Sequence, residues 1–356
     1  MTGRRMYGRI VKLGLLLCLS AGFPLGVIAQ KEAPKPKPEV KDKIKPPTYP
    51  APPSFPREPN GTNEKAIAAD PNVAIKLCIA QGEIKINGTE TNEVRVFVRD
   101  GRKFEFKSLE KNAETGKANW IWITAAGSPG RAVGPSANCL SGESVEIDMP
   151  MGGSIMLDAQ GAGTEIDSIR KATLNILRGS INVRNVVGGV GAVVHRGDVT
   201  VESSSGAIDV QATAGNVMVF DVKPGQVGDL LKVRSSGRGN VVLQNVSHRQ
   251  IDVSSISGNV SFAGKFLSGG IYKFKTSAGS IRMLLPEDTS CKVIASYGFG
   301  TFDSRLPLKI ETENESEGGK SLVGRIGKGD TTNVSITTTS GSIGISQQGQ
   351  KFELKF

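Results

Sequence analysis

The sequence has few of the residues that acid–base catalysis and sugar stacking usually require. It holds two histidines in 356 residues, and 5% of its residues are aromatic. Histidine is the side chain whose ordinary pKa lies nearest neutral pH, so its scarcity limits the choice of a general base. His195 is expected in a strand just before Gly197, and His248 at a corner. No nucleophile-elbow serine, P-loop or His-Glu-x-x-His pattern occurs, which argues against the enzyme classes that these motifs mark.

Cysteine is scarce as well. Cys18 lies in an N-terminal apolar run, so an exported mature chain keeps Cys78, Cys139 and Cys291. No Cys-x-x-Cys spacing occurs, so neither a redox pair nor a structural zinc site is indicated. An odd count leaves one cysteine outside a disulfide in an oxidising compartment. Cys78 and Cys139 are the candidate disulfide pair, and Cys291 is expected to be a small buried hydrophobe.

Long apolar runs are also missing after the first 29 residues. Residues 1–29 combine an Arg-led start, a short apolar stretch and small or branched residues at Val27-Ile28-Ala29, which predicts a signal peptide cleaved after Ala29. A twin-arginine signal at Arg4-Arg5 and lipid attachment at Cys18 are weaker alternatives. No later segment approaches the about 20 apolar residues of a membrane helix, so the mature chain is expected to have no transmembrane segment.

Residues 30–68 read as a Pro/Lys-rich disordered linker. Ten of the 18 prolines fall between Pro34 and Pro59, interleaved with lysines. Such a composition cannot bury a core and predicts a semi-rigid extended tether. Residues 1–65 hold 12 Lys/Arg and five Asp/Glu, and therefore carry 7 of the net +10 charges. The domain that follows is only weakly basic, which argues against nucleic acid as a partner.

What the sequence has in abundance is a short unit built on glycine. Each central glycine is followed by Ser, Asp or Asn and then by two apolar residues separated by one variable residue. The six central copies begin at Gly179, Gly197, Gly215, Gly239, Gly258 and Gly279, a later copy begins at Gly341, and Gly82 is expected to open the series. The central glycines are 18, 18, 24, 19 and 21 residues apart. This spacing, with an internal period of two, predicts an all-β solenoid of about 20-residue rungs.

The columns of the aligned repeat are chemically uniform. Two positions after the glycine stand Ile181, Val199, Val217, Val241, Val260 and Ile281, and four positions after it stand Val183, Val201, Val219, Leu243, Phe262 and Met283. Because strand side chains alternate between faces, both columns are expected to point inward. The Ser, Asp or Asn after the glycine is expected to hydrogen-bond its own backbone at a corner.

A second strand is expected about seven residues before several glycines, as in Ile251–Val253 before Gly258. Each rung would then hold at least two strands, and roughly ten rungs would form a rod about 45 Å long. An ordinary β-sandwich of short strands is the alternative.

The repeat resembles the bacterial "putative adhesin" family of secreted β-solenoid domains of unknown function. The units that carry the resemblance are Thr213–Val217, Ser277–Ile281 and Thr339–Ile343, and the C-terminal order is Ser277–Pro286, Cys291–Gly300, Gly324–Gly329 and Val334–Ile345. The resemblance is best over 145–346, within a domain expected at 69–356, and 73–98 would be its first rung. Residues 108–138, with Trp120 and Trp122, fit the repeat poorly and would be an insertion or a divergent rung. The family defines no catalytic residues.

These observations predict a non-enzymatic exported protein of the periplasm, cell envelope or cell surface, with adhesin-like binding or structural contacts. No catalytic, cofactor-binding or metal-binding residues are expected, and envelope or surface glycans or proteins are the partner classes considered. The alternative is a carbohydrate-active β-helix enzyme, a polysaccharide lyase or hydrolase, which would gather paired acids with Arg and Lys on adjacent rungs. Asp209 and Asp221 are the acids considered for such a pair. Residues 351–356 are expected to form a final capping strand.

Overall fold

The computed structural model describes residues 63–127, 138–328 and 331–348. The predicted signal peptide, most of the predicted linker and the predicted capping strand at 351–356 lie outside these ranges. Within them the chain forms 25 strands and no helix, which confirms the all-β prediction. Accordingly, no helix that could cross a membrane is found in the described ranges.

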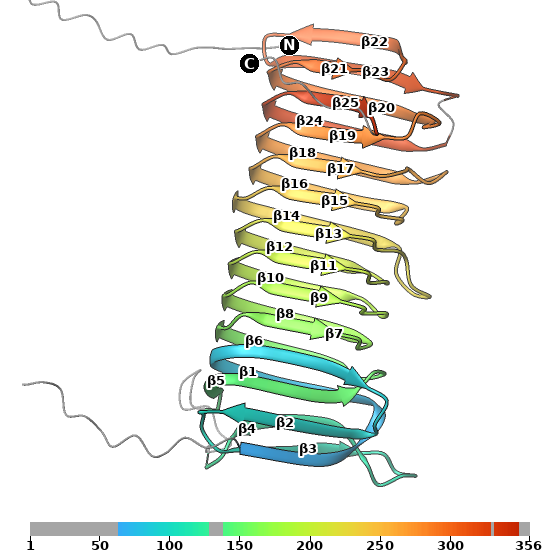
Figure 1. Cartoon of the computed structure of the whole chain (residues 1–356). Coiled ribbons are helices and arrows are strands. Elements are labelled where there is room, and N and C mark those ends of the chain that lie inside the picture. The colour runs from blue at the N-terminus through green and yellow to red at the C-terminus, as the bar shows by residue number, and fades with distance from the viewer. Residues whose placement is uncertain (1–62, 128–137, 329–330, 349–356) are drawn as a thin grey trace, which may run out of the picture. The chain divides into compact units, whose positions relative to one another are not determined.

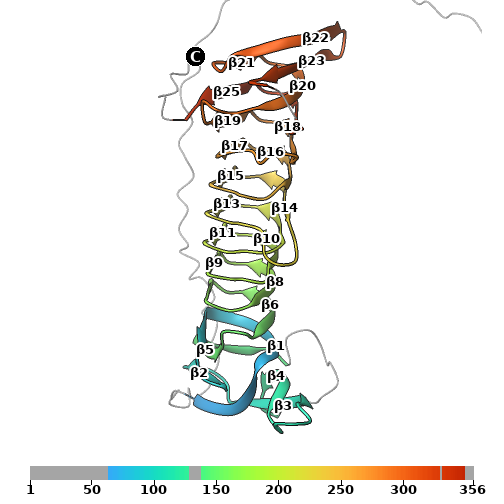
Figure 2. The same cartoon turned by 90° about the vertical axis from the view of Figure 1, so that its right-hand side faces the viewer.

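Each central rung consists of a long strand of seven to nine residues, a corner and a short strand of four or five. The strands are β6 (Ser154–Gly161), β7 (Thr164–Asp167), β8 (Lys171–Arg178), β9 (Ile181–Arg184), β10 (Val190–Arg196), β11 (Val199–Glu202), β12 (Ile208–Ala214), β13 (Val217–Phe220), β14 (Leu230–Arg238), β15 (Val241–Gln244), β16 (Gln250–Ser257), β17 (Val260–Ala263), β18 (Ile271–Ala278) and β19 (Ile281–Leu285). Long strands pair in parallel with long strands, and short with short (Figure 1). The solenoid therefore has a long-strand column and a short-strand column, which Figure 2 shows side by side.

The core lies between the two columns, as the repeat predicts. In the short-strand column the residues two and four positions after the central glycines are 0–2% exposed. Val199 aligns with Ile181 and Val217 in the neighbouring strands, so the inward side chains form continuous aliphatic rows. The long strands contribute a second set of rows, which includes Val210, Val233 and Val253. Burial of these rows supplies the main stabilising term of the fold.

The glycine is required because adjacent rungs approach closely at the corner. A Cβ atom built on Gly239 would overlap the carbonyl oxygen of Gly215 on the neighbouring rung, and the same relation recurs between Gly258 and Gly239. Any side chain here would push two hydrogen-bonded rungs apart. The fixed glycine register therefore follows from the stacking distance.

The polar residue after each glycine bonds to the next rung, which corrects the prediction that it bonds its own backbone. The backbone N–H of Asn216 donates to Asp198 Oδ1 at 2.7 Å, and that of Asn240 donates to Asn216 Oδ1 at 3.0 Å. The same bond links Asn259 to Asn240 at 3.1 Å and Ser280 to Asn259 at 2.9 Å. In parallel stacking, equivalent residues lie directly above one another, so a short side chain reaches the next backbone more readily than its own.

At the N-terminal end, β1 (Asn63–Thr89) forms a rung that is covered on both sides. Its residues 74–79 pair with β6 and its residues 84–87 with β7. On the opposite side it pairs with β4 (Ala118–Ala125) and β5 (Leu140–Pro150), while β2 (Glu93–Arg99) and β3 (Phe104–Lys111) complete that end. Figure 1 shows β1 between β5 and β6.

Two sequence assignments are settled at this end. Residues 63–68, assigned to the linker, are the start of β1 and pair with β2. Within the poorly fitting segment 108–138, residues 118–125 form β4, which pairs antiparallel with β3 and in parallel with β1. Because β5 also pairs in parallel with β1, β4 and β5 form a divergent rung rather than an insertion. Trp120 and Trp122 lie in β4.

At the C-terminal end the order of rungs also departs from the order of the chain. β24 (Asn333–Ser340) and β25 (Ile343–Gln347) lie between β18–β19 on one side and β20 (Cys291–Phe299) with β21 (Phe302–Ser304) on the other. β22 (Leu308–Ser316) and β23 (Gly319–Ile326) extend the long-strand column beyond β20. Counting the β4–β5, β1, β24–β25 and β20–β21 rungs with the seven rungs from β6 to β19, the described chain forms eleven rungs.

Candidate functional site

A charged groove of about 640 Å³ lies on the described surface at the N-terminal end of the short-strand column. Its charged lining residues are Glu83, Lys85, Arg99, Glu146, Glu165 and Asp198. They come from β1, β2, β5, β7 and the corner before β11, which the stacking of the strands brings together. The groove is therefore a product of the fold and not of one local motif.

A first row of charges crosses the groove at one register. Lys85 of β1 is aligned with Glu146 of β5 on one side and with Glu165 of β7 on the other. Lys85 Nζ lies 3.7 Å from Glu146 Oε1. A cation thus stands between two carboxylates on three adjacent strands.

A second row lies two residues further along the same strands. Asn87 Nδ2 donates to Glu146 Oε1 at 3.1 Å and to Asp148 Oδ1 at 3.0 Å. Arg184 of β9 binds Glu165 at 3.1 Å and Asp167 at 2.8 Å. Two pairs of carboxylates are therefore each joined by one donor side chain.

The environment keeps one of these carboxylates ionised. Burial alone would raise the pKa of Asp167, but hydrogen bonds from Asn185, Ser168 and Arg184 outweigh burial and lower it. The same contact with Asp167 raises the pKa of Arg184. The pair is a fixed, fully charged element of the surface.

Metal ligation is not indicated in the described ranges, where no group of three or more His, Cys, Asp or Glu side chains lies close enough to hold an ion. The lining side chains can instead offer hydrogen bonds and fixed charges of both signs. Such an arrangement suits a ligand that carries hydroxyl, amide or charged groups.

Neither histidine lines this groove. His195 is exposed at the end of β10, as predicted. His248 lies in the predicted corner between β15 and β16, and it is 0% exposed there. Its Nε2–H donates to the carbonyl oxygen of Gly206 at 2.8 Å, and burial lowers its pKa. It fills a corner of the core.

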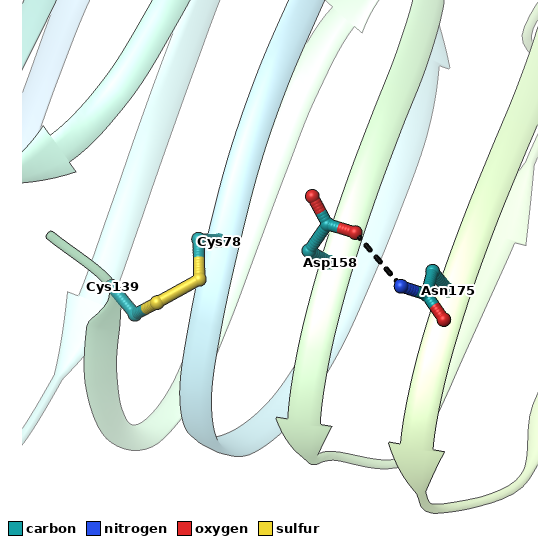
Figure 3. The surroundings of a disulfide bond; sticks show 4 residues. All are labelled: Cys78, Cys139, Asp158 and Asn175. Atoms are coloured by element: carbon teal, nitrogen blue, oxygen red, sulfur yellow. Dashed lines mark hydrogen bonds between the residues drawn. A yellow bond between two sulfur atoms is a disulfide. The ribbon is translucent and has the colours of Figure 1, made fainter. Parts of the chain in front are cut away.

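The structure joins Cys78 of β1 to Cys139, next to β5, in a disulfide with a Cα–Cα distance of 4.5 Å (Figure 3). Asn175 Nδ2 donates to Asp158 Oδ1 at 3.2 Å on the adjacent strands. Cys78, both these residues and His195 line a hollow of about 350 Å³ on the long-strand face. Cys291 is buried at the start of β20.

The acids considered for catalysis are not brought together. Asp209 points outward from β12, 3.9 Å from Lys232. Asp221 follows β13 in the short-strand column and accepts a hydrogen bond from Asn245 at 2.9 Å. Each acid therefore has its own partner in a different column.

Sequence reasoning missed the paired carboxylates of the groove, although they carry a local signal. Glu146-Ile147-Asp148 and Glu165-Ile166-Asp167 are the same triplet, repeated 19 residues apart. Both triplets lie before the glycine series that defined the alignment. The alternation places their acids outward and their isoleucines in the core.

Comparison with known proteins supports the resemblance over the C-terminal rungs. Residues 231–346 match the family described as Toastrack DUF4097. No curated protein matches the chain. Among solved structures, a "putative cell adhesion protein" from Clostridium sporogenes aligns with 81% of this chain and 100% of its own, at 14% identity and a TM-score of 0.18. The predicted similarity to an adhesin-like β-solenoid family of unknown function is thus confirmed for residues 231–346, which match the Toastrack DUF4097 family.

Proposed function

We propose that the protein is a non-enzymatic exported protein of the cell envelope or surface, which uses the outer faces of its solenoid for adhesin-like binding or structural contacts. The observation that carries this proposal is the engagement of charged and polar side chains in and beside the groove with acids of neighbouring rungs. Lys85, Asn87 and Arg184 each hold acids of neighbouring strands. A rigid surface with fixed charges suits recognition, because little side-chain freedom is lost on binding.

The proposed location rests on the sequence and on the disulfide. The segment 1–29 has the pattern of a signal peptide, and disulfides persist in oxidising compartments such as the periplasm or the cell exterior. Mass spectrometry of the exported fraction should find a mature N-terminus near Gln30. An intact Met1 on a cytoplasmic protein would contradict export.

The proposed partners are envelope or surface glycans or proteins. The groove presents the carboxylates of Glu83, Glu146, Glu165 and Asp198 beside the cations of Lys85 and Arg99. A glycan with amino and hydroxyl groups, or a basic protein surface, would match the excess of acids. Nucleic acid, which is recognised by excess positive charge, would not.

A carbohydrate-active enzyme remains the second candidate because the groove does contain paired carboxylates. A glycosidase of the common type needs one protonated carboxyl group as the acid and one ionised group as the nucleophile or base. The acid usually has a raised pKa. Here hydrogen bonds lower the pKa of Asp167, the opposite of what the acid requires.

Incubation of the purified mature protein with immobilised envelope fractions and a glycan panel tests both candidates. We expect binding without cleavage, and a loss of about tenfold or more in affinity when Glu165→Gln removes one charged contact. Asp252→Asn, on the long-strand face, is the matched control and should bind normally. Release of new reducing ends would establish the enzyme. Equal binding by both variants would exclude the groove as the binding surface.

A further inference from the structure

The last rung of the described chain occupies a slot whose two walls come earlier in the sequence. β24 pairs in parallel with β18 through residues 333–340 and with β20 on its other side. β25 likewise pairs with β19 and with β21. Residues 333–347 therefore lie between the β18–β19 rung and the β20–β21 rung, both of which precede them in the sequence.

This rung is also the connection between the stack and its C-terminal end. β20 pairs with β23 and β24, and β21 pairs with β25, whereas within the described ranges neither of them pairs with β18 or β19. Without residues 333–347 the edges of β18–β19 and of β20–β21 would present unpaired backbone groups. Unpaired strand edges readily accept another strand.

The slot makes specific demands on its occupant. Val334, Ile336, Ile343 and Ile345 fill the inward rows and are 0–1% exposed. Gly341 stands where a Cβ atom would overlap the carbonyl oxygen of Gly279. An occupant must therefore supply a long strand, a glycine corner and a short strand, each with this apolar pattern.

Polar contacts continue the corner ladder through the slot. The backbone N–H of Ser342 donates to Ser280 Oγ at 3.2 Å, and the backbone N–H of Thr301 donates to Ser342 Oγ at 3.3 Å. Thr338 Oγ1 donates to the carbonyl oxygen of Gly279 at 2.9 Å. Residues 333–347 satisfy all of these demands without change, so the partner that fits the slot best is a second copy of this chain.

We propose that the slot also accepts residues 333–347 of a second copy, and that reciprocal exchange gives a rung-exchanged dimer. Every strand pairing and inward contact of the rung is the same in the monomer and in the dimer. Exchange of identical elements is a low-cost route to dimers, and a high local concentration of chains favours it over the intramolecular form. This inference does not depend on the proposed function or on the groove.

Disulfide trapping in the full chain tests the exchange. Lys273 and Ser335 are register partners on the outer side of β18 and β24, whereas Lys275 is the partner of Thr337. One chain carries Lys273→Cys, and an isotope-labelled second chain carries Ser335→Cys. The two are unfolded together, refolded at high concentration and oxidised. A pair with Lys275→Cys in place of Lys273→Cys is the control, because it places the introduced cysteines two residues out of register.

We expect a mixed disulfide dimer several times more abundant for the in-register pair than for the control pair. Light scattering after size exclusion should show a dimer of the unmodified chain that grows with refolding concentration and persists on dilution. A chain that stays monomeric at every refolding concentration would overturn the proposal. Equal yields of mixed dimer from the two pairs would overturn it as well, because they would show only surface collision.

Discussion

Replacement of Gly239 by alanine measures how much the close stacking of the corners contributes. The new Cβ atom would overlap the carbonyl oxygen of Gly215, which belongs to backbone hydrogen-bonded to the rungs on either side. Relief requires a shift of two rungs, so we expect the upper part of the usual overpacking cost, about 3 kcal/mol. With a urea slope of about 3 kcal/mol/M, the midpoint should fall by about 1 M.

Gly191 is the matched control. It lies in β10, and a Cβ atom built on it meets nothing within 4 Å. Gly191→Ala should leave the midpoint unchanged or raise it, because alanine is favoured over glycine inside a strand by about 0.5–1 kcal/mol. The comparison isolates the steric contact from the general effect of removing a glycine.

Urea titrations read by two probes would decide the outcome. Far-ultraviolet circular dichroism reports all rungs, and the fluorescence of the two tryptophans reports β4 at the N-terminal end. If both signals change at the same lowered urea concentration, the rungs unfold together. Transitions at different urea concentrations would instead show local unfolding of the kind that repeat proteins allow. If Gly239→Ala unfolds within about 0.5 kcal/mol of Gly191→Ala, the reasoning about close rung contact is wrong.

Three further predictions concern the core, the disulfide and pH. Val217→Asp should unfold the domain by burying a charge that costs several kcal/mol, whereas Met218→Asp, on the outer face, should leave circular dichroism unchanged. Removal of the Cys78–Cys139 disulfide, which closes a separation of 61 residues, should lower stability by about 4 kcal/mol; an unchanged melting temperature under reduction would contradict this. Because burial lowers the pKa of His248, the unfolded state binds a proton at this residue more readily than the folded state does. Stability should therefore fall as the pH drops below about 6.5. Melting temperatures measured from pH 7.5 to 5 should show this fall, and His248→Leu should flatten it.

The central part of the fold is predictable because each rung repeats the same local constraints. Glycine at the corner and aliphatic residues at Val199 and Val217 leave one arrangement that satisfies both stacking and burial. The order of rungs at the two ends is not predictable in this way. Residues 333–347 carry the same pattern as any other rung, and nothing local says that they pair with β18 rather than continue beyond β21.

The groove is less predictable than the rungs because its charges lie at outward positions, where the repeat imposes no residue type. Glu146 and Glu165 meet Lys85 only because β1 lies between β5 and β7, an order that departs from the chain. His248 shows the opposite difficulty. Its polar type gives no indication of burial, but a hydrogen bond to the carbonyl oxygen of Gly206 satisfies its Nε2–H inside the core.

The inner position of β1 and of the β24–β25 rung determines where the length of the solenoid can change. An added rung could not simply follow β1 or the β24–β25 rung in the stack. The strands that cover β1 are β4 and β5, and those that cover β24–β25 are β20 and β21, and all of them come from other parts of the chain. Between β8 and β13 the rungs follow one another in the chain, and the glycines lie 18 residues apart. Deletion of residues 181–198 would join Ser180 to Val199 and leave every column aligned. Variation in length among solenoids built this way should therefore arise in the middle of the stack, while both ends stay constant.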